Sequence, residues 1–227
     1  MNNKNTRKIN TEKMAGIAIF SALAFVVSLV VRFPVQFLTF DAKDAVITIA
    51  AFVYGPLSAV IISFLAALIE MITISTTGWY GFLMNFASSA VFSLTASLIY
   101  TKKRNLNGAI ISLYSAIGAT VGVMLLLNLL VTPLYLQYVG APITIADMVA
   151  MLPTLLLPFN FAKALMNSAI VMLLYKPLVT ALKRLNIVKT KGEKAPSMTF
   201  NRTTKIILIL GAVGVVLSIT IFLILVL

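Results

Sequence analysis

The segment "AVITIAAFVYGPLSAVIISFLAALIEMIT", residues 45–73, decides how often this chain crosses a membrane. It is almost wholly apolar, but "YGP" at 54–56 divides it, and a proline begins or ends a helix rather than continuing one. The division predicts one helix over 56–74 and a shorter one over 45–53. A helix of the shorter length extends only about 14 Å, against a hydrocarbon core of about 30 Å. We therefore expect it to be a partial or tilted helix that its neighbours support.

The composition places the whole chain in a membrane. Of its 227 residues, 60% are hydrophobic and 11% are charged, whereas soluble domains are about 25% charged. The apolar runs are long and lack the polar–apolar alternation of an outer-membrane barrel, so they predict an all-α integral membrane protein. Cysteine and histidine are both absent, which excludes disulfides, thiol catalysis and histidine metal ligands. We accordingly predict no metal site.

The distribution of basic residues supports two passes within 45–74. The predicted spans are 14–31, 45–53, 56–74, 81–100, 108–135, 155–182 and 206–226. With two passes, the basic residues of 1–13, of the cluster Lys102–Arg104 and of 176–205 all face one side, as the positive-inside rule requires. A single pass would place Lys102–Arg104 outside. The remaining basic residues are Arg32, Lys43 and Lys163. The net charge of +12 is thus interpreted as membrane topology rather than nucleic-acid binding, with the N-terminus in the cytoplasm.

These spans define the expected domain organisation. A cytoplasmic tail, 1–13, precedes a six-helix substrate-binding membrane domain, 14–182, and a basic cytoplasmic linker, 183–205, leads to an extra transmembrane helix, 206–227. The apolar run that begins at Met14 is too long for a cleavable signal, so we expect the first helix to be retained. The glycines of the last helix do not form a GxxxG pair, so no packing motif is identified there.

Polar side chains gather in the outer half of the predicted bundle. Asn160 and Lys163 come early in the sixth helix, which enters from outside, and Asn128, Glu70 and Asn85 lie near the outer ends of the fifth, third and fourth helices. A lysine inside a span costs about 2.5–3.5 kcal/mol on insertion scales, so it normally faces a cavity or a partner. The convergence predicts an outward-opening ligand pocket. The alternatives are asparagines that only bond a neighbouring helix, and a lysine that extends to the membrane surface.

The chemistry of this pocket follows from its side chains. Amides supply donors and acceptors, and an ammonium suits a carbonyl, a carboxylate or a phosphate. Aromatic residues of the outer loops either cover an aromatic ligand or form the usual interfacial belt. They are Phe33, Phe37, Phe40, Trp79 and Tyr80.

Three further polar positions receive a structural interpretation. Asp41 and Asp44 are assigned to the first outer loop, and Glu70 is interpreted as a lone intramembrane carboxylate that offers no ion relay. Asn167 lies one turn deeper than Lys163, and we expect it to bond a neighbouring helix.

The sequence contains no nucleotide-hydrolysing P-loop and no catalytic Ser/His, Cys/His or HExxH arrangement. An enzyme is therefore not predicted, and a transporter of this kind needs partners unless it is a channel or receptor. Ala18 and Ala22 lie four residues apart on the first helix, a spacing that lets another helix approach closely. Internal packing, or chance in an alanine-rich helix, is the alternative explanation.

Several segments resemble the substrate-binding S components of energy-coupling factor (ECF) vitamin transporters, and the riboflavin-specific type most of all. They are "FLTFDAKDA" at 37–45, "AAFVYGPLSAV" at 50–60, "NLLVTPLY" at 128–135 and "LPFNFAKALMNSAIVMLLYKPL" at 157–178. The resemblance covers residues 14–182. "FNxxK" with the upstream Asn–Pro segment is fairly specific to the riboflavin type, whereas "YGP" is common across S components.

The resemblance implies a six-helix bundle in a bacterial cell (plasma) membrane, with both ends of the bundle on the cytoplasmic side, and high-affinity riboflavin uptake. Asn128, Asn160 and Lys163 match residues that hydrogen-bond the flavin ring, and Leu38 matches a position that packs on it. Asn85 is added to this ligand-binding set from its depth in the bundle. Riboflavin would be the transported ligand rather than a cofactor.

Partners and alternatives also follow from the resemblance. Ala18 and Ala22 match alanines that meet the transmembrane T component, and two cytoplasmic ATPases would drive a cycle in which the S component reorients in the membrane. The alternatives are an S component for FMN, FAD or another vitamin, a stand-alone carrier or channel for a small solute, and a structural subunit without a ligand. The resemblance does not account for the helix at 206–226.

Overall fold

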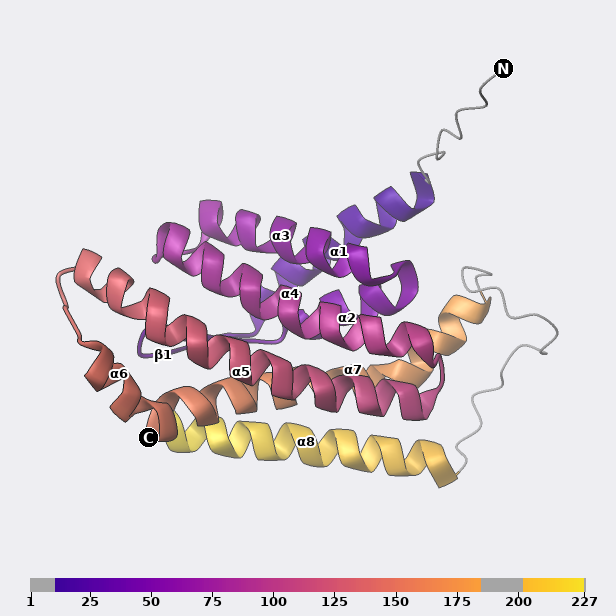
Figure 1. Ribbon diagram of the computed structural model, residues 1–227. Helices are drawn as coiled ribbons and strands as arrows, with labels where there is room; N and C mark the ends of the chain where they lie inside the picture. Colours follow the sequence, from indigo (N-terminus) through magenta and orange to yellow (C-terminus); the bar gives the residue numbers. More distant parts are fainter. Residues whose placement is uncertain (1–10, 185–201, 227) are drawn as a thin grey trace, which may run out of the picture.

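The computed structural model describes residues 11–184 and 202–226, which form an elongated bundle of helices (Figure 1). The elements are α1 (Thr11–Val30), β1 (Arg32–Val35), β2 (Leu38–Asp41), α2 (Lys43–Tyr54), α3 (Pro56–Thr73), α4 (Gly78–Lys102), α5 (Leu106–Tyr138), α6 (Ile145–Met151), a π-helical turn η1 (Leu152–Leu156), α7 (Leu157–Arg184) and α8 (Arg202–Val226). Most of the predicted cytoplasmic tail and basic linker lie outside the described residues.

The apolar segment 45–73 folds as parts of two helices, α2 and α3. Gly55 separates α2 from α3 with φ 95°, a left-handed conformation that favours glycine, and Pro56 begins α3. Most of α2 is buried because α1, α3, α4 and α7 all pack against it. The prediction of a short helix supported by its neighbours is confirmed.

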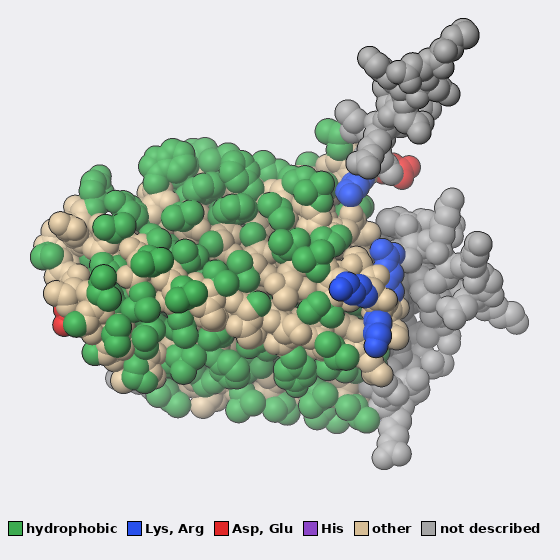
Figure 2. Space-filling model, viewed as in Figure 1, with side chains coloured by type: hydrophobic (Ala, Val, Ile, Leu, Met, Phe, Trp, Pro, Cys, Tyr) green, Lys and Arg blue, Asp and Glu red, His purple; other side chains and the backbone are tan. Residues whose placement is uncertain are grey.

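Six helices of the described residues are long and apolar enough to cross a membrane. They are α1, α3, α4, α5, the continuous segment from α6 into α7, and α8. Hydrophobic side chains cover the visible flank of the bundle, and basic side chains gather at one end of it (Figure 2). The exposed Lys102, Lys103 and Arg104 lie at that end, in the turn between α4 and α5. The chain is a multi-pass all-α membrane protein, as predicted.

Two regions outside the predicted spans have regular structure. β1 and β2 form an antiparallel hairpin in which Phe33 faces Phe40 and Val35 faces Leu38. Pro34 conceals the first strand in the sequence, because proline weakens any strand assignment. The segment between α5 and α7 contains α6, which begins with a capping box between Thr144 and Asp147 and continues through η1 into α7.

The last helix packs tightly, although no motif predicted it. α8 runs antiparallel to α7 along one side of the bundle (Figure 1). A Cβ atom added to Gly214 would lie 3.0 Å from the Cβ of Ala169, so the glycine permits this close approach. Gly211 abuts Leu173 in the same way. The Ser218 hydroxyl then donates to the Ala162 carbonyl at 2.7 Å, so the two helices are also hydrogen-bonded.

Candidate functional site

A pocket of about 400 Å³ opens at the end of the bundle opposite the Lys102–Arg104 cluster. Its walls are the hairpin, the turn between α3 and α4, the first turns of α4, the last turns of α5 and the first turns of α7. This volume lies within the range of about 300–1,000 Å³ that is usual for small-molecule sites. The hairpin contributes a continuous part of the wall, from Gln36 to Thr39, together with Arg32 and Pro34.

All five residues predicted to bind a ligand line this pocket. They are Leu38 from β2, Asn85 from α4, Asn128 from α5, and Asn160 and Lys163 from α7. Four segments of the chain that are distant in sequence therefore meet at the level that the depth of the spans predicted.

Two of the three predicted amide side chains, Asn128 and Asn160, are partly satisfied by their own helices. Asn128 donates from Nδ2 to the Met124 carbonyl at 2.7 Å, and its Oδ1 accepts from the Thr132 hydroxyl at 3.0 Å. Asn160 donates from Nδ2 to the Leu156 carbonyl at 2.7 Å. An amide has two donors and an oxygen with two lone pairs, so each side chain retains capacity for a ligand. Within the described chain, Asn160 Oδ1 accepts no hydrogen bond.

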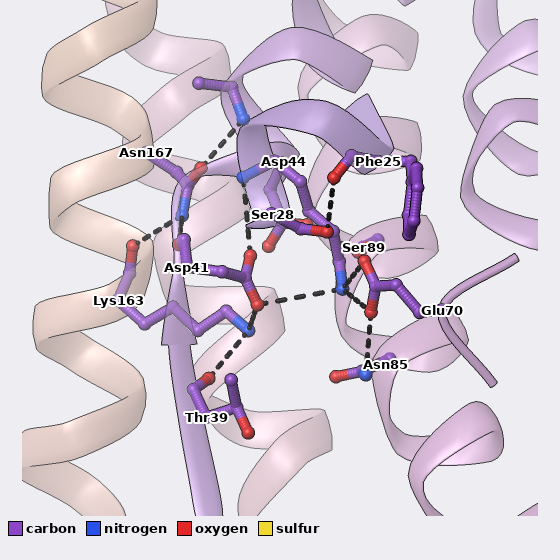
Figure 3. Close-up of polar contacts among 12 residues, drawn as sticks. Phe25, Ser28, Thr39, Asp41, Asp44, Glu70, Asn85, Ser89, Lys163 and Asn167 are labelled. Carbon is purple, nitrogen blue, oxygen red and sulfur yellow. Dashed lines mark hydrogen bonds and ion pairs between the residues drawn. The ribbon is translucent and has the colours of Figure 1, made fainter. Parts of the chain in front are cut away.

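The ammonium of Lys163 does not extend to the membrane surface but bonds the hairpin. Its Nζ lies 2.8 Å from Asp41 Oδ2 and 3.3 Å from the Thr39 carbonyl (Figure 3). An ammonium has three donors, so one remains for a ligand. Asp41 lies between α1 and α2, in the predicted first outer loop, but its carboxylate is 2% exposed and compensates the lysine charge.

The charges continue behind the pocket wall. Lys43 Nζ lies 2.8 and 2.7 Å from the two carboxylate oxygens of Glu70 and 3.6 Å from Asp41 Oδ2. Asn85 then donates to Glu70 Oε2 at 3.0 Å (Figure 3). Lys163 and Asn85, on separate helices of the pocket, are thus joined through Asp41, Lys43 and Glu70. We call these five residues the buried ion chain.

The buried ion chain corrects two expectations. Glu70 is not a lone carboxylate, because Lys43 pairs with it. Asp44, also assigned to the outer loop, is buried and accepts a hydrogen bond from Ser89. The sequence signal for this was "DAKD" at 41–44, directly before the short helix, where charges next to a buried element need internal partners.

The electrostatics of Asp41 favour the ion pairs. Burial disfavours its carboxylate, but the ammonium groups of Lys163 and Lys43 outweigh this effect and hold the pKa of Asp41 below its usual value. Its contribution to stability is therefore present at neutral pH and is lost only as the pH falls through that lowered pKa.

Asn167 fastens α7 to the junction between β2 and α2. Its Oδ1 accepts from the Ala45 amide at 2.8 Å, and its Nδ2 donates to the carbonyls of Asp41 at 3.1 Å and Lys163 at 2.9 Å (Figure 3). The expectation that it bonds a neighbouring helix is confirmed, since Ala45 belongs to α2.

The five predicted aromatic residues have three different surroundings. Phe37 and Tyr80 line the pocket, as does Tyr135, which the sequence analysis did not identify. Trp79 is 71% exposed and does not line it. The other two, Phe33 and Phe40, contact α8 instead.

Ala18 and Ala22 are both exposed on α1. The opposite face of this helix, which includes Ile17, Ser21 and Ala24, is buried against the bundle. The internal-packing alternative is therefore excluded for the two alanines, and their face is available to another helix.

A first prediction concerns the buried ion chain. Glu70→Gln keeps the shape of the side chain but leaves Lys43 without its closest carboxylate, so we expect the free energy of unfolding to fall by about 3–5 kcal/mol. Glu12→Gln, at the exposed start of α1, is the matched control. Unfolding in mixed micelles measures the stability of both variants. The double variant Lys43→Met/Glu70→Met removes both charges and should recover most of the lost stability. Equal stability of the two single variants would contradict a structural role for the chain of charges.

The comparison with known proteins agrees with this geometry. The sequence model of one family, described as "ECF transporter, substrate-specific component", matches residues 12–175. A solved structure titled "Structure and mechanism of the S component of a bacterial ECF transporter" superposes with a TM-score of 0.63 at 30% sequence identity. It covers 78% of this chain and 100% of its own chain.

Curated relatives point the same way. The chain is 32% identical over 191 residues to the riboflavin transporter RibU of Staphylococcus aureus, covering 79% of this chain and 98% of that protein. It is 24% identical to the riboflavin transporter FmnP of Bacillus subtilis, covering 74% of this chain and 92% of that protein. With the match of the family model over most of its length, the chain belongs to the substrate-specific components of ECF transporters.

Proposed function

We propose that this chain binds riboflavin at the outer face of a bacterial plasma membrane and delivers it to an ECF module. The observation that carries the proposal is the meeting of Asn128, Asn160 and Lys163 in one pocket. The riboflavin transporters among its relatives support the choice of ligand.

The pocket suits a flat, neutral heteroaromatic ligand. An isoalloxazine ring has carbonyl and imide groups along one edge, which match the free amide groups and the remaining ammonium donor. The rings of Phe37, Tyr80 and Tyr135 offer apolar surface to its faces. Since Asp41 already compensates the charge of Lys163, a neutral ring can accept a hydrogen bond from Lys163 without breaking that ion pair.

The orientation in the membrane follows from the basic end of the bundle. Lys102, Lys103 and Arg104 are exposed at the end away from the pocket, which the positive-inside rule assigns to the cytoplasm. The N-terminus then lies in the cytoplasm and the pocket opens outward. Ala18 and Ala22 provide the docking face for the T component, and two cytoplasmic ATPases supply the energy.

The ligand assignment is tested by titration of purified protein with riboflavin, whose fluorescence should be quenched on binding. Asn160→Ala removes a buried partner of the ring, and we expect about 10- to 100-fold weaker binding. Asn107→Ala, at the exposed far end of α5, should bind as the wild type does. Unchanged affinity in Asn160→Ala would remove this residue from the site, and failure of the wild-type chain to bind riboflavin would reject the ligand.

A second candidate, FMN, is favoured by one observation. Arg32 lines the pocket, and among the described residues its guanidinium makes no hydrogen bond or ion pair. A guanidinium can hold a phosphate in a bidentate arrangement. If FMN is a ligand, Arg32→Gln should weaken FMN binding about tenfold or more and leave riboflavin binding nearly unchanged. Equal effects on the two flavins in parallel titrations would exclude phosphate recognition by Arg32.

Docking of the T component is tested by separating binding from uptake. Ala18→Trp fills the space that a partner helix needs, so riboflavin binding should be retained while uptake in cells that express the ECF module is abolished. Leu126→Trp, on the exposed flank of α5, should transport normally. Loss of binding in Ala18→Trp would refute the docking role. Uptake by this chain without any ECF module would favour the stand-alone carrier.

A further inference from the structure

The helix α8 lies beyond residue 175, where the family match ends, yet it is integrated into the fold. It packs along α7, whereas α1 packs on α2 and α3 (Figure 1). Its presence therefore leaves the exposed face of α1 unobstructed. A helix that served only to anchor the chain would need no contact with the site, but α8 reaches the hairpin that forms part of the pocket wall.

The hairpin presents different residues to the pocket and to α8. On one face, Arg32, Pro34 and Thr39 line the pocket, and Leu38 joins them next to the turn. Phe33 and Phe40 lie directly across from each other in the β1–β2 register and contact α8 instead. This division follows from the alternation of side chains along a strand.

Phe222 of α8 contacts both of these phenylalanines. Its ring centroid lies 5.7 Å from that of Phe33 and 5.0 Å from that of Phe40, within the range of favourable aromatic pairs. Phe40 also forms an edge-to-face pair with Phe159, which lines the pocket. A continuous series of rings thus leads from α8 through the hairpin to the ligand site.

The rest of α8 holds Phe222 in this place. Ile221 and Leu225 pack into the same cluster as Val35 and Phe40, which are 3% and 2% exposed. One turn earlier, Ser218 is hydrogen-bonded to the α7 backbone. The hairpin is therefore enclosed between the pocket on one face and a fixed helix on the other.

We propose that Phe222 is a positioning residue that holds the β1–β2 hairpin against the pocket and so prolongs the residence of the ligand. This inference rests on the proposed riboflavin-binding function. The hairpin forms one continuous part of the pocket wall, so its displacement opens a route for the ligand to leave. Because α8 covers the face of the hairpin away from the pocket, a displacement that opens the pocket shifts Phe33 and Phe40 against Phe222 and disrupts these ring contacts. Removing the ring lowers this barrier and accelerates dissociation.

The test measures release of labelled riboflavin from the full-length protein after a chase with excess unlabelled riboflavin. Phe222→Ala should release the ligand roughly 3- to 10-fold faster, and Phe222→Leu should restore most of the wild-type rate. Ile224→Ala is the matched control, because Ile224 lies on the same helix but is 72% exposed. Phe33→Ala approaches the contact from the hairpin and, at 48% exposure, does not endanger folding.

The two sides of the contact should be coupled. Release from the double variant Phe33→Ala/Phe222→Ala should be no faster than from Phe222→Ala alone, because Phe222→Ala already removes the contact between Phe33 and Phe222. The proposal would be overturned if Phe33→Ala released riboflavin at the wild-type rate. It would also be overturned if Phe222→Ala and Ile224→Ala released it at equal rates.

A second readout separates this proposal from the function on which it rests. Hydrogen exchange of the amides in residues 32–41 should be faster in Phe222→Ala than in Ile224→Ala, with or without ligand. If the wild-type chain binds no riboflavin, the proposed function fails. If it binds riboflavin but the hairpin exchanges equally in both variants, only the role of Phe222 fails.

Discussion

The carboxylate of Asp41 is the group on which the site depends, because it lies between two buried ammonium groups. Its Oδ2 lies 2.8 Å from Lys163 Nζ, whose charge it compensates, and 3.6 Å from Lys43 Nζ. Glu70 compensates the charge of Lys43. A single buried charge at this depth would be costly, and a linked set of opposite charges with further hydrogen bonds reduces the cost. Removal of any inner member leaves an unpaired charge, so the hairpin, α2, α3 and α7 must adopt one relative arrangement.

This constraint explains how an apolar bundle maintains a polar pocket. Lys163 and Asn85 belong to helices that are separated by the ligand space, and the buried ion chain joins them behind the wall. Asn167 adds hydrogen bonds between α7 and the start of α2. The polar groups offered to a ligand are therefore oriented before it arrives, which reduces the entropy lost on binding. The pocket geometry is consistent with the family, because interactions within the protein hold in place the polar groups that would hydrogen-bond the edge of a flavin ring.

Much of this architecture was predictable because membrane constraints act on composition and charge. Length and hydrophobicity located the helices, and the cluster Lys102–Arg104 together with Pro56 resolved 45–74 into two. The depth of Asn128, Asn160 and Lys163 within their spans predicted that they would meet, because depth is a property of position along a helix. The resemblance contributed the proposed ligand, riboflavin, which depth alone cannot supply.

The missed features depend on contacts between distant segments. Asp41, Lys43 and Glu70 look like a loop pair and a lone acid until the fold brings them together. The hairpin is concealed by Pro34, and the packing of α8 uses Gly211 and Gly214 at a spacing that matches no common motif. Each of these is a pairing across the tertiary structure, for which a single sequence carries little periodic signal.

The most direct measurement is the absorbance spectrum of the protein after incubation with riboflavin and removal of free ligand by gel filtration. A flavin band close to stoichiometric with the protein, shifted from that of free riboflavin by the enclosed environment, is the result predicted by a pocket formed from Asn128, Asn160 and Lys163. A protein that elutes folded and without a flavin band would contradict the central claim that this S component binds riboflavin.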